Sequence, residues 1–202
     1  MFDKSSSGRG GWTRGARLLA LLCGSAGVAF AAACKNDGKA KGPPPPSPVV
    51  VAFYSMRIAS HSTGAPTAAE LRQFAPFLSD TLNALLKAAA AERDREAKRA
   101  PDEKPPFVEG DLYSSMFEGP TSFAVMRDSA AATQKKSVVR FTYVSNGDSY
   151  TWTDTVTLGK KGRSDVIEDI AYGGAGEFGN HGTLRTSLEA ALAPAGSLPA
   201  KP

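Results

Sequence analysis

Two acidic residues, Asp154 and Glu168, are the side chains in this sequence most suited to chemistry, because each interrupts an apolar pattern in a predicted strand. Carboxylates that share a partly desolvated surface disfavour each other's ionisation, so at least one of them should have a raised pKa. Such a pair can contact a polar ligand or exchange protons with it. An inward carboxylate can equally be structural, with an arginine, a tyrosine hydroxyl or a helix N-terminus as its partner. The sequence leaves all three roles open.

The orientation of Asp154 follows from the hairpin that contains it. Asn146-Gly147 favours a two-residue type I′ turn, which needs positive φ at both positions. With that turn Tyr143 faces Tyr150, and Asp154 lies opposite Val139. One face of the hairpin is then apolar except for Asp154, and it carries Val139, Phe141, Tyr143, Tyr150, Trp152, Val156 and Leu158. The other face is expected to contact water and carries Arg140, Thr142, Thr151, Thr153, Thr155 and Thr157.

Glu168 occupies a similar place in the next predicted strand, residues 164–172. Val166, Ile170 and Tyr172 share its face, since successive side chains of a strand alternate in direction. If the apolar faces of both strands lie on one side of the sheet, Glu168 is opposite Asp154 or one pair away diagonally. We therefore predict that the two carboxylates converge on an aromatic-lined surface. The candidate ligand-binding residues are Tyr113, Trp152, Asp154 and Glu168.

Other residues give little support for catalysis or for a metal site. His61 and His181 are isolated in turn-forming sequence, and Ser114-Ser115 lacks the glycines of a nucleophile elbow. The glycine-rich segment 173–176 lacks the Lys-Ser/Thr pair of a phosphate-binding loop. The sequence therefore predicts no catalytic residue, no metal site and no cofactor.

The elements that position these residues are expected to be helices followed by an antiparallel sheet. Thr67 and Glu70 form a capping-box pattern, and Ser79-Asp80 can start a new helix after Pro76 interrupts the first. Thr183 is the expected N-cap of a short C-terminal helix, 183–192. The connection 101–119, which carries Tyr113, is expected to pack across an opening of the fold and to rim it. Strands are expected at 121–127, 137–145, 149–158 and 164–172.

The N-terminal residues 1–33 have the pattern of an export signal. Four basic residues precede an apolar or small run, Leu18 to Ala33, which is shorter than the ~20 residues that span a bilayer. The segment Phe30-Ala31-Ala32-Ala33-Cys34 resembles the lipobox of bacterial lipoprotein precursors, with Ala31 where leucine is commoner. That resemblance implies lipidation of Cys34 as the first mature residue. Because Ala31 and Ala33 also suit the ordinary signal peptidase, plain secretion is the alternative.

These features divide the chain into four parts. We expect a signal peptide at 1–33, a proline-rich linker at 34–48, one folded domain at 49–193 and a disordered tail at 194–202. The prolines at 43–46 favour an extended linker between the lipid and the domain. In enterobacterial lipoproteins an aspartate after the lipidated cysteine is typical of the inner membrane. Lys35 therefore favours the outer membrane, with the domain facing the periplasm.

Composition excludes some partners. The whole chain carries 24 basic and 20 acidic residues, but residues 1–33 contain four of the basic and one of the acidic ones. The remaining charge is close to neutral, so nucleic-acid binding lacks its electrostatic basis. Cys34 is the only thiol after Cys23, which lies within the predicted signal. A disulfide within the mature domain and a thiolate zinc site are therefore excluded.

A last set of sequence features is spread over the whole folded region, in the segments Phe53-Tyr54, 77–79, 106–107, 110–115, 117–121, 152–156 and 167–170. Together these segments resemble a family of uncharacterised bacterial lipoproteins and periplasmic proteins with a nuclear-transport-factor-2-like cone fold. The resemblance implies that residues 49–58, ambiguous by propensity alone, form a helix. It implies an α+β domain in which N-terminal helices pack on a curved antiparallel sheet of four to five strands, with a short C-terminal helix. It transfers no catalytic residue, because a shared fold does not fix an activity.

The function expected from these observations is that of a membrane-anchored envelope lipoprotein. Its domain would bind a small molecule or a protein segment without catalysing a reaction. One alternative is an immunity or inhibitor type of lipoprotein that blocks an envelope enzyme by direct contact. The other is a hydrolase or isomerase that uses Asp154 and Glu168 as an acid–base pair.

Overall fold

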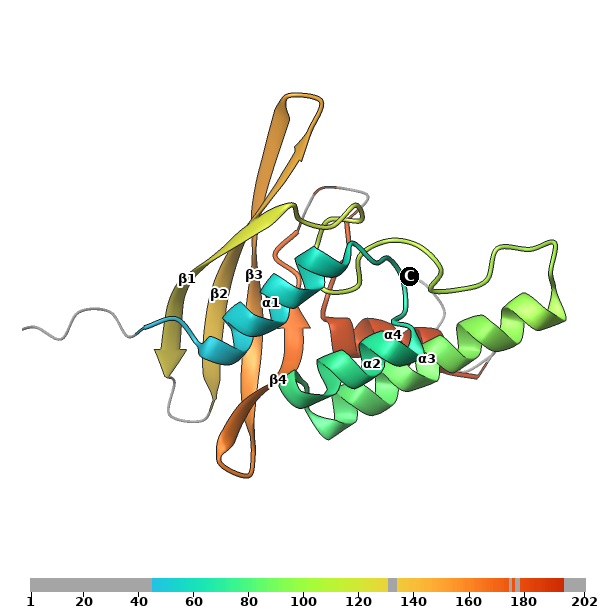
Figure 1. Cartoon of the computed structure of the whole chain (residues 1–202), viewed down its shortest axis with the longest axis horizontal. Helices are drawn as coiled ribbons and strands as arrows, with labels where there is room; N and C mark the ends of the chain where they lie inside the picture. The colour runs from blue at the N-terminus through green and yellow to red at the C-terminus, as the bar shows by residue number, and fades with distance from the viewer. Residues whose placement is uncertain (1–44, 131–133, 175, 177–178, 195–202) are drawn as a thin grey trace, which may run out of the picture. The chain divides into compact units, whose positions relative to one another are not determined.

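The computed structural model describes residues 45–130, 134–174, 176 and 179–194, and these form an α+β domain. A four-stranded antiparallel sheet has the order β1-β2-β3-β4, and helices precede and follow it (Figure 1). This confirms the predicted fold class, whereas the cone shape stays a prediction. The elements are α1 (Pro48–Ser60), α2 (Ala68–Phe74), the short 3-10 helix η1 (Ala75–Phe77), α3 (Asp80–Arg99), β1 (Ser122–Ala130), β2 (Lys135–Ser145), β3 (Asp148–Lys161), β4 (Ser164–Ala171) and α4 (Leu184–Leu192).

The signal peptide, Cys34 and the tail 195–202 lie outside the described residues. Of the predicted linker, only residues 45–48 are described, and Pro48 is already the first residue of α1. None of the helices in the described ranges combines the length and the apolar character that a membrane span requires.

Each predicted helix start is confirmed. Thr67 accepts from the Glu70 backbone N–H, and the Glu70 carboxylate accepts from the Thr67 N–H, so both halves of the capping box form. The Ser79 side chain caps α3 by accepting from the Leu82 N–H. Thr183 caps α4 in the same way through Thr186. The resemblance was also right about 49–58, because α1 covers that whole segment.

The β2–β3 register is the one that the turn predicted. Asn146 and Gly147 have φ values of 51° and 90°, and Tyr143 pairs with Tyr150. The same register places Phe141 opposite Trp152 and Val139 opposite Asp154. The face carrying Phe141 and Trp152 is buried, while Thr151 and Thr153 on the other face are exposed.

The core lies between the inner face of the sheet and the helices. Phe53 and Tyr54 of α1 meet Phe74, Tyr113 and Phe141 in edge-to-face contacts with ring centroids 4.9–5.6 Å apart. Burying an aromatic side chain removes about 150–250 Å² from water, so each ring contributes several kcal/mol at about 25 cal/mol per Å². On the far side of the core, α4 packs against α3 and β4. The loop residue Tyr113 is therefore part of the core.

One end of the β2–β3 hairpin extends past the rest of the sheet. The pairing of β1 begins at Ser122 opposite Thr142, and that of β4 ends at Ala171 opposite Thr155. Residues 143–150 consequently pair only with each other and form the projecting ribbon at the top of Figure 1, called the hairpin arm below.

Candidate functional site

Asp154 is buried and holds two loops together. Its side chain is on the inner face, as predicted, and the residue is 1% exposed. One carboxylate oxygen accepts from the Ser115 N–H at 2.8 Å, and the other accepts from the Gly173 N–H at 2.8 Å and from the Ser115 hydroxyl. A Cβ at Gly173 would lie 1.8 Å from the Thr153 carbonyl oxygen, so only glycine fits this approach. Asp154 therefore ties β3 to the 101–119 loop and to the loop after β4.

The pKa of Asp154 is raised, as the sequence predicted for one of the two carboxylates. Burial is the main cause, because desolvation disfavours the charged form. Hydrogen bonds from the Ser115 hydroxyl and from the Gly173 and Ser115 N–H groups oppose the shift without cancelling it. Repulsion from Glu168, which the prediction invoked, is not among the causes.

This shift makes stability depend on pH. A carboxyl whose pKa is higher in the folded state contributes stabilisation that is complete below its ordinary pKa of 3.8 and is lost as pH rises through the folded value. We expect the destabilisation caused by Asp154→Asn to be largest near about pH 3.5 and smaller near about pH 7. Urea unfolding of both proteins at the two pH values measures this. A penalty that grows with pH would mean that folding lowers the pKa of Asp154.

The predicted convergence of Asp154 and Glu168 is wrong. Thr157 pairs with Asp169 and Leu158 with Ile167, so Glu168 is the extra residue of a β-bulge and has no partner on β3. Its side chain lies against Gly159, where a Cβ would approach Glu168 Oε1 to 2.3 Å. Gly159 is five residues from Asp154, about 17 Å along a strand. The bulge shifts the pairing by one residue, so that Val156 pairs with Ile170 on one side of it and Leu158 pairs with Ile167 on the other.

Glu168 instead lines a polar depression at the opposite end of β3. There its carboxylate accepts a hydrogen bond from Gln134 Nε2 at 3.3 Å, beside the ion pairs of Lys135 and Lys160 with Asp165. Those lysines lower the pKa of Asp165 mainly through the Lys160 contact. The described residues contain no group of three or more histidine, cysteine, aspartate or glutamate side chains arranged to hold a metal ion.

Tyr113 and Trp152 do not rim an opening either. Tyr113 is 1% exposed, and its ring packs edge-to-face against Phe53 and Phe74. Trp152 is buried beside Phe141, with ring centroids 5.5 Å apart. The four predicted ligand-binding residues are therefore not gathered around one cavity, because three are core side chains and Glu168 lies at the far end of β3.

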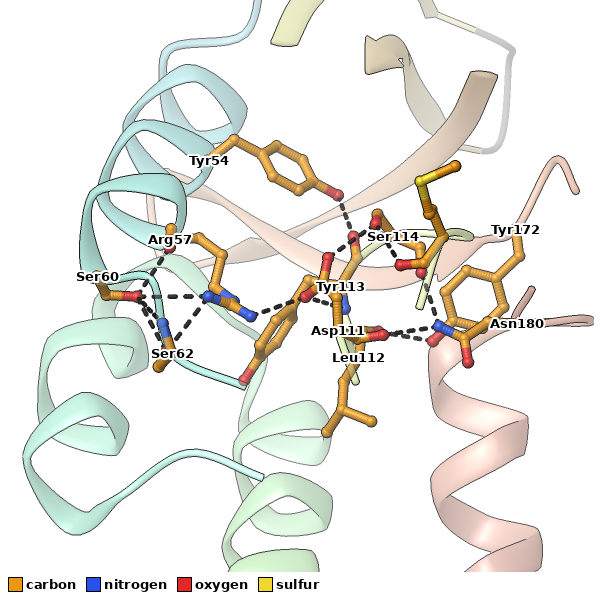
Figure 2. Close-up of polar contacts among 11 residues, drawn as sticks. Tyr54, Arg57, Ser60, Ser62, Asp111, Leu112, Tyr113, Ser114, Tyr172 and Asn180 are labelled. Carbon is orange, nitrogen blue, oxygen red and sulfur yellow. Dashed lines mark hydrogen bonds and ion pairs between the residues drawn. The ribbon is translucent and has the colours of Figure 1, made fainter. Parts of the chain in front are cut away.

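The structure brings together a different charged pair, Arg57 of α1 and Asp111 of the 101–119 loop. Arg57 Nη2 donates to Asp111 Oδ1 at 2.9 Å, and both residues are buried. Asp111 also accepts from the Tyr113 N–H at 3.1 Å and from the Ser114 hydroxyl at 2.7 Å (Figure 2). The guanidinium carbon lies 5.1 Å from the centre of the Tyr113 ring. Arg57 thus joins the end of α1 to the loop.

Three uncharged hydrogen-bond donors, from α1 and from the segment between β4 and α4, also hold the 101–119 loop in place. The Tyr54 hydroxyl donates to the Tyr113 carbonyl at 3.0 Å, and the Tyr172 hydroxyl donates to the Leu112 carbonyl at 2.6 Å (Figure 2). Asn180 Nδ2 donates to the carbonyls of Asp111 and Ser114, each at 2.7 Å. Burial raises the pKa of both tyrosines, so they remain protonated donors at neutral pH.

A cavity of about 280 Å³ lies beside this charged pair. Arg57 and Asp111 line it, together with the residues that follow α1 and with the segment that leads into β1. Tyr143, at the base of the hairpin arm, lines it as well. The cavity therefore combines a buried ion pair with polar rim residues and one half-buried aromatic ring: this is the candidate site, named the Arg57–Asp111 cavity below.

Comparison with family models, curated proteins and solved structures finds no match to this chain. The likeness to the cone-fold lipoproteins therefore remains a prediction from the sequence. The assignment of the Arg57–Asp111 cavity as the candidate site is therefore based on its geometry alone.

One residue of the sequence, Arg57, points to this cavity. Arg57 is the only charged residue in α1, where its neighbours are apolar or small. A single charged side chain on a helix whose other residues are typical of a buried helix requires an oppositely charged or hydrogen-bonding partner in the core. Asp111 is the first acidic residue after the conformationally special Gly110, whose φ is 77°. No motif in the neighbouring sequence relates Asp111 to Arg57, because the two residues are 54 positions apart.

Proposed function

We propose that this chain is a lipid-anchored protein of the bacterial cell envelope whose folded domain binds a polar group in the Arg57–Asp111 cavity. The bound group belongs to a small molecule or to a segment of another protein. The observation that carries this proposal is the buried Arg57–Asp111 pair on the cavity wall, with Arg57 6% exposed.

A charged pair at this position suits recognition better than stability. Desolvating two ions costs several kcal/mol each, and apolar residues of similar size are often neutral or better in their place. Arg57 Nε is buried with no hydrogen-bond partner in the described part of the chain, so even this pair is incompletely compensated. Fixed charges that are held by the fold are already oriented when a ligand arrives, which lowers the cost of binding.

The location is proposed from the N-terminal sequence. A charged leader, a short apolar run and Cys34 after Ala31-Ala32-Ala33 support export followed by lipidation. Several acyl chains are needed for stable anchoring, because a single chain gives only marginal membrane binding. The proline-rich segment would then separate the domain from the outer membrane on its periplasmic side.

Mass spectrometry of the full chain made in a bacterial host tests the anchor. We expect the mature protein to begin at Cys34 and to carry acyl groups, and we expect Cys34→Ser to leave the membrane fraction. A mature protein that begins at Cys34 with a free thiol would contradict lipidation and would favour ordinary secretion.

Native mass spectrometry of the same preparation tests binding. We expect a co-purifying mass that is lost in Tyr143→Ala, which alters the cavity wall. Tyr150→Ala is the matched control, because Tyr150 pairs with Tyr143 across the hairpin arm but is not a cavity residue. Equal retention in both variants would contradict binding in this cavity.

The inhibitor type of function has one observation in its favour, the exposed apolar side chains of the hairpin arm. Val144 is 52% exposed and Tyr150 is 53% exposed, on opposite faces of the arm. A protein groove that receives the arm would bury both side chains. Photocrosslinking from position 150, with exposed Met126 on β1 as the control position, tests this alternative. The catalytic alternative is not proposed, since its carboxylate pair does not form.

A further inference from the structure

We propose that the group bound in the Arg57–Asp111 cavity is a cation, an ammonium or a guanidinium, on a small molecule or on a protein side chain. This inference rests on the proposed function, because it names the chemistry of the ligand at the same site. Three features of the cavity support it: an unpaired carboxylate, the C-terminal end of a helix, and an aromatic wall.

The charges on the cavity wall leave one negative charge without a partner. Arg57 and Asp111 neutralise each other through a contact of 2.9 Å. Glu118 lines the same cavity and is exposed, and it makes no ion pair or hydrogen bond with the described residues. A cation that enters the cavity therefore finds a carboxylate without a counter-charge, while an anion finds a guanidinium whose charge Asp111 already balances.

The end of α1 adds to this negative potential. The helix ends at Ser60, and the cavity is lined around this C-terminus by Ile58 and by the three residues His61, Ser62 and Thr63. The last carbonyl groups of a helix carry the partial negative charge of its dipole, and that charge favours cations. Arg57 in the last turn already uses this effect, so the fold itself holds one cation at this end of α1.

Tyr143 provides a surface for the cation and for the carbon chain that carries it. Its ring is half-buried and belongs to the cavity wall. A cation within about 6 Å of the centre of an aromatic ring is attracted by the negative face of that ring. The cavity volume of about 280 Å³ is at the low end for ligand pockets, which suits one side chain or head group and not a larger ligand.

The experiment is an NMR titration of the full chain with three probes of similar size. They are the N-acetyl methylamides of lysine, norleucine and glutamic acid. We expect the lysine derivative to shift the signals of Tyr143 and Glu118 and to bind at least about tenfold more tightly than the norleucine derivative, because charge-assisted contacts are worth about 1.4 kcal/mol or more. Raising the salt concentration from about 0.05 M to about 0.5 M should weaken this binding.

Two variants assign the effect to the cavity. Glu118→Gln removes the unpaired carboxylate and should weaken the lysine derivative about fivefold or more, in line with the loss of one charge-assisted contact. Glu103→Gln makes the same change in net charge at an exposed residue that does not line the cavity, and it should leave binding unchanged. An equal loss in the two variants would overturn the inference.

The remaining outcomes separate this inference from the proposed function. Tighter binding of the glutamic acid derivative would overturn the cation and would show that Arg57 selects an anion. If none of the probes binds while native mass spectrometry finds a mass that Tyr143→Ala loses, the cation inference fails and the cavity remains a binding site. If neither experiment detects a ligand, both proposals fail.

Discussion

Replacing Asp154 by leucine should lower the free energy of unfolding by about 3 kcal/mol or more, because buried donors that lose their acceptor cost about 1–3 kcal/mol each. The two N–H groups of Ser115 and Gly173 would both lose their acceptor, as would the Ser115 hydroxyl. Leucine has a similar size and removes a desolvated charge, but it accepts no hydrogen bond. Urea unfolding monitored by Trp152 fluorescence measures the change.

A matched control lies three residues away on the same strand. Thr151 is on the exposed face of β3, so Thr151→Val should change the free energy of unfolding by no more than about 0.5 kcal/mol. An Asp154→Leu protein as stable as the wild type would mean that this carboxylate does not hold the two loops together. Retention of every ligand by that stable variant would also remove Asp154 from any role in binding.

The sheet could be predicted where the decisive signal was local. Asn146-Gly147 determines its own turn geometry, and the turn determines the pairing of every residue from Ser145–Asp148 back to Lys135–Leu158. The helix starts were predictable for the same reason, since Thr67 and Glu70 cap each other within one helical turn. Inward orientation of Asp154 was a consequence of that register.

The β-bulge at Glu168 could not be derived in this way. Ile167 and Ile170 are both buried although they are three residues apart, and only an extra residue between them permits this in a strand. If side-chain directions alternated strictly along β4, Val166, Glu168 and Ile170 would lie on one face. Gly159 was the available signal, because its missing side chain leaves room for Glu168 on the neighbouring strand.

The candidate site was missed because its parts come from distant segments. Arg57 belongs to α1, Asp111 to a long loop and Tyr143 to β2, so no spacing in the sequence relates them. The loop itself packs on the fold as expected, but its aromatic residue Tyr113 enters the core, while Ser114 donates to Asp111 and Ser115 donates to Asp154. Long-range pairing of this kind depends on packing, which the pattern of one sequence does not determine.

The second large effect concerns Arg57. Arg57→Met keeps the length of the side chain but leaves Asp111 as a buried carboxylate with no counter-charge. Removing one partner of a buried ion pair costs about 3–5 kcal/mol, so we expect a loss of that size in the free energy of unfolding. Arg185→Met is a suitable control, since Arg185 pairs with Glu189 on the exposed surface of α4 and surface pairs contribute about 0–1 kcal/mol.

The double variant decides whether this loss comes from the unpaired charge. Asp111→Asn keeps an acceptor for the Tyr113 N–H and removes the carboxylate charge, so Arg57→Met combined with Asp111→Asn should be more stable than Arg57→Met alone. Residues in direct contact show coupling energies of about 0.5–3 kcal/mol in double-mutant cycles. For Arg57 and Asp111 we expect a coupling energy of about 2 kcal/mol. Strictly additive effects would mean that Arg57 stabilises the fold by packing on Tyr113, whose ring it covers, and not through its charge. The buried pair would then no longer distinguish the cavity from ordinary core, and the binding proposal would depend on Glu118 and Tyr143 alone.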